Sequence, residues 1–291
     1  MKRISKAIFI ILGSLLILLV VLGLALSAIG VSRLNKTLDV QAESIAVVND
    51  EAVLARGEHL VNVACKSCHG ADLGGQPILD DGPIGTIYAS NISGLAETHT
   101  DGDLVRAIRH GVDSDGRQLM IMPAETFVHF SEEDLGAIIA YLKTVPRDGE
   151  AHPAPRLGPM GRILLGAGLF GDVFPAEYID HDAPFPEMPD VGANLAYGQY
   201  TSRFCSSCHG ANLEGGQPPD PQSPPAPSLV AAGAWSEEQF LTTMRSGVTP
   251  VGRQLDPAFM PWESFGKFSD EELRGLWLYL QTVPEQQTST N

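Results

Sequence analysis

Cysteine is scarce in this sequence. The chain has 291 residues and only four cysteines, and all four fall in two copies of one hexapeptide, CKSCHG at Cys65 to Gly70 and CSSCHG at Cys205 to Gly210. Because 44% of the residues are apolar, the chain can build ordinary hydrophobic cores and does not depend on disulfides to fold.

Basic residues are also few. Nineteen Lys and Arg against 35 Asp and Glu give a formal net charge of −16, which argues against nucleic acid and against anionic lipid headgroups as partners. The negative charge has two interpretations, simple solubility or docking on the basic surface of a protein partner.

One long run carries no charge, AIFIILGSLLILLVVLGLALSAIG from Ala7 to Gly30. It is long enough to cross about 30 Å of hydrocarbon as a helix, so it predicts a membrane span. A cleaved signal peptide is the alternative, since Ala25 and Ser27 resemble a small-residue cleavage site. The apolar part of a cleaved signal is usually only about 7–15 residues, which favours an uncleaved anchor.

The basic residues on either side of this run predict its orientation in the membrane. Lys2, Arg3 and Lys6 precede it, whereas Arg33 and Lys36 follow it. This weak positive-inside bias favours a cytoplasmic N-terminus. We therefore expect a single-pass protein of the cytoplasmic (inner) membrane with its soluble domains on the periplasmic side.

The remainder of the chain contains an internal repeat. Each unit has a helix start with glycine (Gly57, Gly198), the CxxCHG motif, a Gly-Gly-Gln-Pro turn, a helix before a Gly-Val pair, GRQL, a Met-Pro dipeptide and a final helix ending in YLKTVP or YLQTVP. The order predicts six segments: a transmembrane anchor (1–30), a stalk (31–52), a first domain (53–147), a structured connector with a short helix near residues 158–170 (148–192), a second domain (193–286) and a tail (287–291).

The final helices are clearly marked. Ser131 with Asp134, and Ser269 with Glu272, have capping-box spacing, and apolar residues then recur with a helical period until Pro146 and Pro284. The earlier segments DGDLVRAIRHGV and SEEQFLTTMRSGV predict helices that end at glycines 111 and 247. Strand signals are nearly absent, so we expect two small helical units with long loops. The proline-rich stretch Asp220 to Ser228 predicts a surface loop.

The CxxCH motif is compatible with three chemistries. A thioredoxin-like redox pair should lie near a βαβ pattern, and a zinc ribbon needs its two CxxC pairs about 15–20 residues apart; neither condition is met. The third is c-type haem attachment. Cys65 and Cys68, or Cys205 and Cys208, form thioethers to a porphyrin, while His69 or His209 becomes an iron ligand. The motifs therefore predict two covalently bound haem c groups.

The repeat also suggests the sixth iron ligands. Met122 and Met260 stand at the same spacing before the capping serines Ser131 and Ser269, and each is followed by proline, whereas other Met and His residues in these regions lack a counterpart. Methionine ligation raises the reduction potential and closes the coordination sphere. Closed sites favour outer-sphere electron transfer over catalysis, so we expect an electron carrier and not an enzyme.

These residues carry a family resemblance. Each unit resembles a class I cytochrome c domain, and the whole chain is similar to membrane-anchored di-haem c-type cytochromes, including cytochrome subunits that accompany periplasmic dehydrogenases. The resemblance implies a mainly α fold, an N-terminal transmembrane helix followed by two tandem class I cytochrome c domains. It also implies redox protein partners, with a dehydrogenase or quinol-oxidising complex as donor and an acceptor such as a terminal oxidase, and no small-molecule substrate.

Two other functions remain open. A di-haem peroxidase-like enzyme would need one haem without its distal ligand, and an interaction subunit of a respiratory assembly would use its haems mainly as structure. The family resemblance also implies a proline carbonyl that accepts the proximal histidine's N–H. Pro227 in APSL fits, whereas the first unit has Ser90 and Asn91 in ASNI, so we expect the two sites to differ there.

Haem propionates are carboxylates that need compensation when they are buried. Four arginines occupy equivalent positions in the two units, Arg109 with Arg245 and Arg117 with Arg253. They are our candidates for propionate partners, with solvated surface arginines as the alternative.

Overall fold

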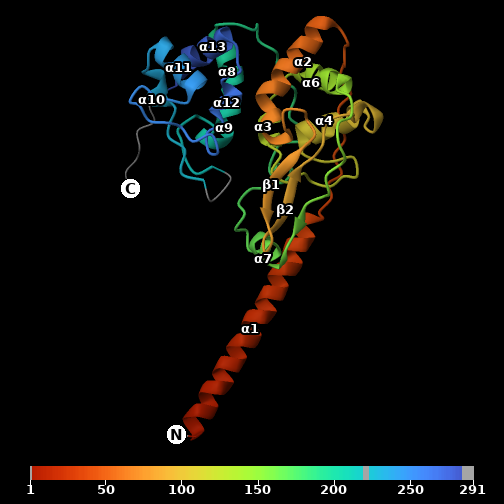
Figure 1. The fold of residues 1–291 in the computed structure, drawn as a ribbon, viewed down its shortest axis with the longest axis vertical. Coiled ribbons are helices and arrows are strands. Elements are labelled where there is room, and N and C mark those ends of the chain that lie inside the picture. The colour runs from red at the N-terminus through yellow and green to blue at the C-terminus, as the bar shows by residue number, and fades with distance from the viewer. Residues whose placement is uncertain (1, 219–222, 284–291) are drawn as a thin grey trace.

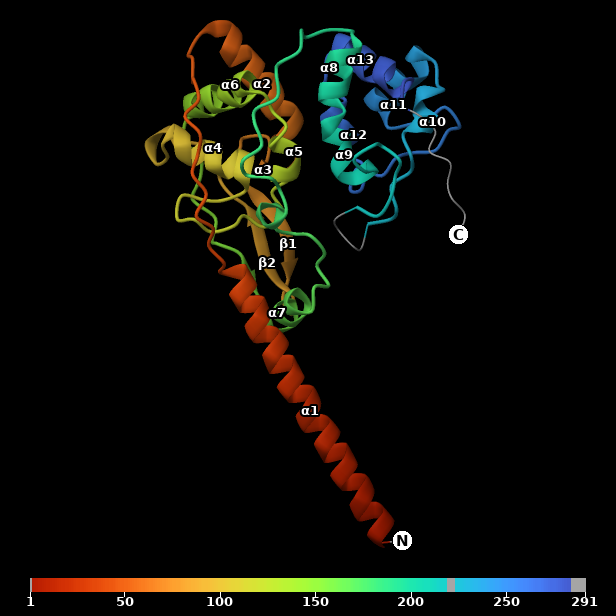
Figure 2. The ribbon, with the colours of Figure 1, turned by 180° about the vertical axis from the view of Figure 1, so that it is seen from behind.

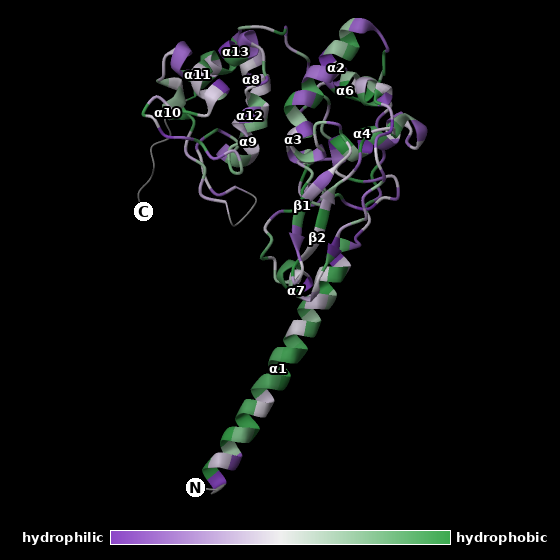
Figure 3. Cartoon of the chain, viewed as in Figure 1, coloured by the Kyte–Doolittle hydropathy of each residue, from purple (hydrophilic) through white to green (hydrophobic). Residues whose placement is uncertain are grey.

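The chain begins as one long helix, α1 (Lys2–Leu34), that projects away from two helical units (Figure 1). The computed structural model describes residues 2–218 and 223–283. Pro284, the end of the expected second domain at 286, the expected tail 287–291 and residues 220–222 of the expected proline-rich loop lie outside this range. Helix α1 is long and apolar enough to cross a membrane, and hydrophobic residues dominate its length (Figure 3).

The first unit follows α1 and sits at its C-terminal end. Its final helix buries the predicted apolar face, with Leu135, Ile138, Ile139 and Leu142 at most 2% exposed. Its elements and those of the connector are α2 (Glu51–Ala64), α3 (Lys66–His69), β1 (Gln76–Asp81), β2 (Gly85–Ala89), η1 (Leu95–Glu97), α4 (Asp101–His110), α5 (Ala124–Phe127), α6 (Glu132–Thr144), β3 (Arg156–Leu157), α7 (Pro159–Gly166) and η2 (Pro175–Glu177).

The second unit lies beside the first, away from the free end of α1, as both views show (Figures 1 and 2). The helices predicted from the repeat are present in it, and Gly247 ends α11 in the left-handed region as Gly111 ends α4. Its elements are α8 (Leu195–Thr201), α9 (Arg203–His209), α10 (Val230–Gly233), α11 (Glu237–Ser246), α12 (Trp262–Phe265) and α13 (Asp270–Leu280).

In each unit the first helix crosses the last at a glycine. A methyl group on Gly57 of α2 would overlap the carbonyl oxygen of Ala137 in α6, and one on Gly198 of α8 would overlap that of Gly275 in α13. These glycines therefore allow the two helix backbones to touch, which fixes where the CxxCH motif emerges at the end of α2 or in α9.

The expectation of almost no strands was wrong for the first unit. Strands β1 and β2 form an antiparallel hairpin, and β3 adds to β2 to make a sheet of order β1-β2-β3. The sequence IGTIYA contains the β-branched and aromatic residues that favour strands. The third strand comes from the connector, and its pairing with Gly85 and Thr86 could not be predicted from local sequence.

Residues 37–49 do not stand apart as a stalk. The Leu38 amide donates to the carbonyl of Gly116 (2.8 Å), and Ala42, Ile45 and Val47 pack against the hydrophobic core. The segment lies extended along the first unit, where the side chains of Ala42 and Glu43 meet α4 and the backbone of Ala46 meets α6.

A buried polar network joins the two units. Arg56 of α2 forms a bidentate pair with Asp134 (2.8 and 2.8 Å) and also contacts Glu272 of the second unit (3.0 Å). His59 donates to Glu272 (2.7 Å), and Tyr200 of the second unit donates to Asp134 (2.8 Å). Both carboxylates are at most 2% exposed, so the interface depends on their being paired.

Tyr200 also alters a helix cap. The Ser131 hydroxyl accepts from the Asp134 amide as predicted, but the Ser131 amide donates to the Tyr200 hydroxyl (3.0 Å) and not to the Asp134 carboxylate. In α13 the capping box of Ser269 and Glu272 is complete within its own helix. The second unit therefore completes the N-terminus of α6.

Candidate functional site

One continuous cavity of about 570 Å³ lies between the two units and reaches into both. Its walls are mostly apolar, with Ile87, Leu104 and Phe265 among the contributors. The residues that the sequence singled out for attachment and ligation all line it: Cys65, Cys68, His69, Met122, Cys205, Cys208, His209 and Met260.

Both CxxCH motifs lie on short helical turns. The first motif consists of Cys65, the N-cap of α3, and α3 itself, which ends at Gly70; α9 holds the second motif and ends at Gly210. These glycines have φ of 84° and 83°. A helical turn brings the two thiols and the imidazole to one side, as attachment to one macrocycle requires. The left-handed glycine then turns the chain away beneath the histidine.

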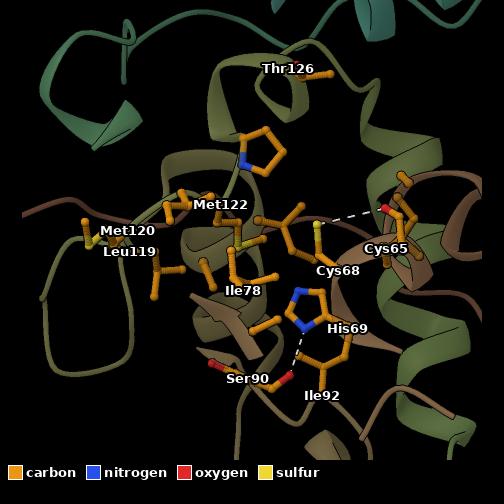
Figure 4. Close-up of a pocket in the computed structure, with 18 of the residues that line it drawn as sticks. Cys65, Cys68, His69, Ile78, Ser90, Ile92, Leu119, Met120, Met122 and Thr126 are labelled. Carbon is orange, nitrogen blue, oxygen red and sulfur yellow. Dashed lines mark hydrogen bonds between the residues drawn. The ribbon is translucent and has the colours of Figure 1, made fainter. Parts of the chain in front are cut away.

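A backbone carbonyl orients each histidine. His69 Nδ1 donates to the carbonyl oxygen of Ser90 (2.8 Å), and His209 Nδ1 donates to that of Pro227 (2.7 Å). In Figure 4 the other ring nitrogen of His69 faces the interior of the pocket, on the side of Met122. Each histidine is thereby held as the tautomer whose Nε2 is free to bind a metal.

The expected difference between the two turns does not extend to this contact. The carbonyl accepts the hydrogen bond, and a serine supplies one as readily as a proline. Asn91 also stabilises the first turn, since its side-chain amide donates to the carbonyl of Asp148 (2.6 Å) and its oxygen accepts from the Ser93 amide (2.9 Å).

Two leucines hold these carbonyls in place, and sequence reasoning missed them. Leu73 and Leu213 are 2% exposed and adopt φ of 63° and 59°, in the left-handed region that leucine rarely occupies. Their carbonyls accept from the amides of Ile92 and Leu229 (2.9 Å each), two residues beyond Ser90 and Pro227. Their equivalent positions in the repeat were the available signal.

The methionine segments are held by the connector and by short helices. In the first unit Ile121 has φ of 71°, and its amide donates to the carbonyl of Val173 in the connector (2.8 Å). Met122 and Met260 are both partly buried against the hydrophobic core. Met120 instead packs against a separate cluster, and Figure 4 places it farther from His69 than Met122.

The four arginines predicted as propionate partners do not line the cavity within the described residues. Arg117 is exposed and pairs with Asp113 and Asp115, and Arg253 is exposed. Their contacts and positions give the propionate role no support. The spacing within the repeat gave them equivalent positions but did not reveal which face of the loop they occupy.

Arg109 and Arg245 share a different role. Arg109 is fully buried and donates to the carbonyl of Val128 (2.6 Å), which ends α5; Arg245 donates to the carbonyl of Gly266, which ends α12. Each arginine thus ties its helix to the C-terminus of the short helix that follows the Met-Pro dipeptide. Arg109 also pairs with Glu43 (2.9 Å).

Burial controls protonation at the site. It raises the pKa of the Cys65 and Cys205 thiols to about 12, with a smaller contribution from Cys68 and Cys208. It lowers the pKa of His69 and His209, against the hydrogen bonds to their backbone carbonyls. At neutral pH the imidazoles are therefore neutral and able to act as ligands, whereas the Cys65 and Cys205 thiols stay protonated.

The residues present fit covalently attached haem. The cavity is apolar, as a porphyrin requires, and each motif presents two thiols and a neutral imidazole with a methionine nearby. In residues 2–218 and 223–283, no group of three or more His, Cys, Asp and Glu is placed to bind a metal ion directly.

An aromatic cluster lies where the two halves of the cavity meet. Phe204, just before the second motif, contacts Phe130 of the first unit edge-on (centroids 5.5 Å apart) and Phe268 of its own unit (5.5 Å). Phe130 and Phe204 both line the cavity. The rings of Phe130 and Phe204 therefore bring the two units into contact at the cavity wall.

Two family models match the chain, one in each unit. Residues 52–142 match the model described as cytochrome C oxidase, cbb3-type, subunit III, and residues 195–284 match the model described as cytochrome c. Together the matches cover the two repeat units and leave α1 and the connector between them unmatched.

Curated relatives resemble most of the chain. The cytochrome c subunit of alcohol dehydrogenase (quinone) from Gluconobacter oxydans (strain 621H) is 28% identical over 275 residues, which is 81% of this chain and 55% of that protein. The fructose dehydrogenase cytochrome subunit of Gluconobacter japonicus is 24% identical over 268 residues, 79% of this chain and 52% of that protein. The gluconate 2-dehydrogenase cytochrome c subunit of Pantoea cypripedii is 37% identical over 103 residues, 32% of this chain and 23% of that protein. The chain thus spans about half the length of the first two.

Proposed function

Because the chain carries two tandem cytochrome c domains, we propose that it is a membrane-anchored di-haem electron carrier. It takes electrons from a dehydrogenase or quinol-oxidising complex and passes them to an acceptor such as a terminal oxidase, on the periplasmic side of the cytoplasmic membrane. The observation that carries this proposal is that both CxxCH motifs and both Met-Pro methionines line one shared cavity.

Haem, when bound, supplies a one-electron Fe(III)/Fe(II) couple at each site. Cys65 and Cys68 hold one group, and Cys205 and Cys208 hold the other. The carbonyls of Ser90 and Pro227 fix the two histidines with Nε2 toward the cavity. The apolar walls exclude water, which together with methionine ligation favours a high reduction potential.

A dehydrogenase as donor is supported by the relatives, which are named as cytochrome subunits of dehydrogenases. The chain's acidic surface suits a partner with a basic docking face. Helix α1 supports membrane attachment, and the basic residues before it support an N-terminus on the cytoplasmic side.

Spectroscopy of ligand variants tests the two sites. Met122→Ala should remove the iron–sulfur charge-transfer absorption of one haem and leave the other, and Met260→Ala should do the converse. Met120→Ala is the matched control and should keep both signals. If the double variant of Met122 and Met260 retained the signal in full, the assignment of these ligands would be wrong.

Co-purification tests the partner. Mild-detergent isolation of the intact assembly should bring down a dehydrogenase, whose substrate should then reduce both haems in stopped-flow measurements. Isolation of the chain without a dehydrogenase, or with one whose substrate does not reduce the haems, would contradict the proposed donor. Neither result would affect haem attachment.

A further inference from the structure

The connector helix α7 packs along the C-terminal part of α1. The side chain of Ile163 lies 3.8 Å from the position of a Cβ on Gly23, and methyl groups on Gly166 or Gly30 would overlap the carbonyl oxygens of Leu26 or Arg162. Arg162 and Gly166 thus lie at the level of Leu26 and Gly30, and the Ile163 side chain reaches Gly23, deeper along α1. Figures 1 and 2 both place α7 beside α1 at the lower end of the hairpin.

These contact levels fall within the expected membrane. A hydrocarbon core of about 30 Å takes about 20 helical residues, which, centred on the uncharged run, reaches from about residue 9 to about residue 28. Gly23 and Leu26 lie inside this range and Gly30 lies just beyond it. Helix α7 therefore lies at the boundary between the headgroups and the edge of the hydrocarbon.

The surface of residues 159–170, which we call the α7 segment, matches that location. Met160 is 50% exposed and Leu169 is 61% exposed, and on α1 at the same levels Leu24 and Ile29 are 68% and 48% exposed. Figure 3 shows that apolar residues continue from α1 into the neighbouring α7. An apolar surface that continues a membrane helix is suited to lipid.

The charge of the α7 segment also differs from that of the rest of the chain. Residues 159–170 contain no acidic residue, in a chain with 35, and their single charge is Arg162. Arg162 is exposed and lies beside Gly30, at the level of the headgroups. The overall negative charge that disfavours lipid contact is thus absent where contact would occur.

We infer that the α7 segment inserts into the bilayer surface beside α1 and forms a second point of membrane contact. Because α7 also packs against β2 and β3 of the first unit, this contact fixes the height and tilt of the first unit above the membrane. The inference rests on α1 remaining attached, since cleavage after Ser27 would remove Gly23 and Leu26 from the surface that α7 contacts.

Site-directed spin labelling in phosphatidylcholine vesicles tests the inference. With the four native cysteines in thioethers, Leu169→Cys provides a single labelling position in the haem-loaded full chain. Val251→Cys, 90% exposed on the second unit, is the matched aqueous control, and Leu15→Cys in α1 is the hydrocarbon standard. Collision rates with oxygen and with the polar reagent NiEDDA report the depth of each label.

The label at 169 should collide with NiEDDA several-fold less often than the label at 251, and with oxygen more often, giving a depth between the two standards. Equal behaviour at 169 and 251 would overturn the inference. Protection at 169 from both reagents would also overturn it, because it would show that protein and not lipid covers the segment. Intact mass of the membrane-extracted chain shows separately whether α1 is retained.

Discussion

Loss of the Arg56 side chain should destabilise the assembly of the two units strongly. Arg56 makes three charge-assisted hydrogen bonds of 2.8, 2.8 and 3.0 Å to Asp134 and Glu272. In Arg56→Ala these carboxylates, 1% and 2% exposed, stay buried without the guanidinium, and Glu272 keeps only His59, Tyr197 and the Ser269 amide. Removing one partner from a buried ion pair costs about 3–5 kcal/mol, which is the expected loss in free energy of unfolding.

Urea unfolding of the haem-loaded protein in detergent, followed by far-ultraviolet circular dichroism, measures this loss. Lys143→Ala is the control, because Lys143 pairs with Asp101 at the surface of α6 and should cost at most about 1 kcal/mol. Arg56→Lys should fall between the two, since an ammonium cannot form the bidentate pair.

A double variant separates the missing cation from general damage. Arg56→Ala with Asp134→Ala removes one of the stranded carboxylates, so its cost should be less than the sum of the two single costs. If Arg56→Ala lost no more stability than Lys143→Ala, the buried network would not hold the units together.

Three further predictions concern the same scaffold. Burial alone would raise the pKa of Glu272, but hydrogen bonds from His59, Tyr197 and the Ser269 amide lower it to about 2. The ionised Glu272 should therefore contribute up to about 3 kcal/mol to the free energy of unfolding above pH 4.5, and this contribution should be lost as the pH falls toward 2. Acid unfolding with and without Glu272→Gln measures it. Gly198→Ala should cost more than about 3 kcal/mol and reduce haem loading of the second unit, whereas Gly82→Ala, where a methyl group meets nothing within 4 Å, should not. Tyr200→Phe should cost about 1–3 kcal/mol by leaving the amide that begins α6 without a partner; unchanged unfolding would show that water replaces the hydroxyl.

The sequence predicted the parts of the fold that depend on local rules. Capping serines, helical periods and C-terminal glycines located α4, α6, α11 and α13, because each signal acts within a turn or two of the chain. The short helix near residues 158–170 was also predicted, as α7. The eight residues of the two motifs and the Met-Pro pairs line one cavity because the repeat keeps their order and spacing.

What could not be predicted depends on contacts between distant segments. Arg109 was a candidate for a haem propionate, yet Glu43 and the connector enclose it instead. Strand β3 pairs with β2 although the two strands are more than sixty residues apart in the sequence. Leu73 and Leu213 adopt a backbone that their side chains disfavour, and only the surrounding hydrogen bonds require it.

Equivalent positions in the two units carry different side chains at their interface. Arg56 corresponds to Tyr197 and His59 to Tyr200, while Asp134 and Glu272 are both acidic. Two copies of the second unit facing each other would bury two carboxylates among tyrosines with no cation, so that pairing is disfavoured. The first unit therefore pairs with the second unit in preference to a second copy of either one. Two chains that exchanged units would still have to place a first unit against a second unit at each interface.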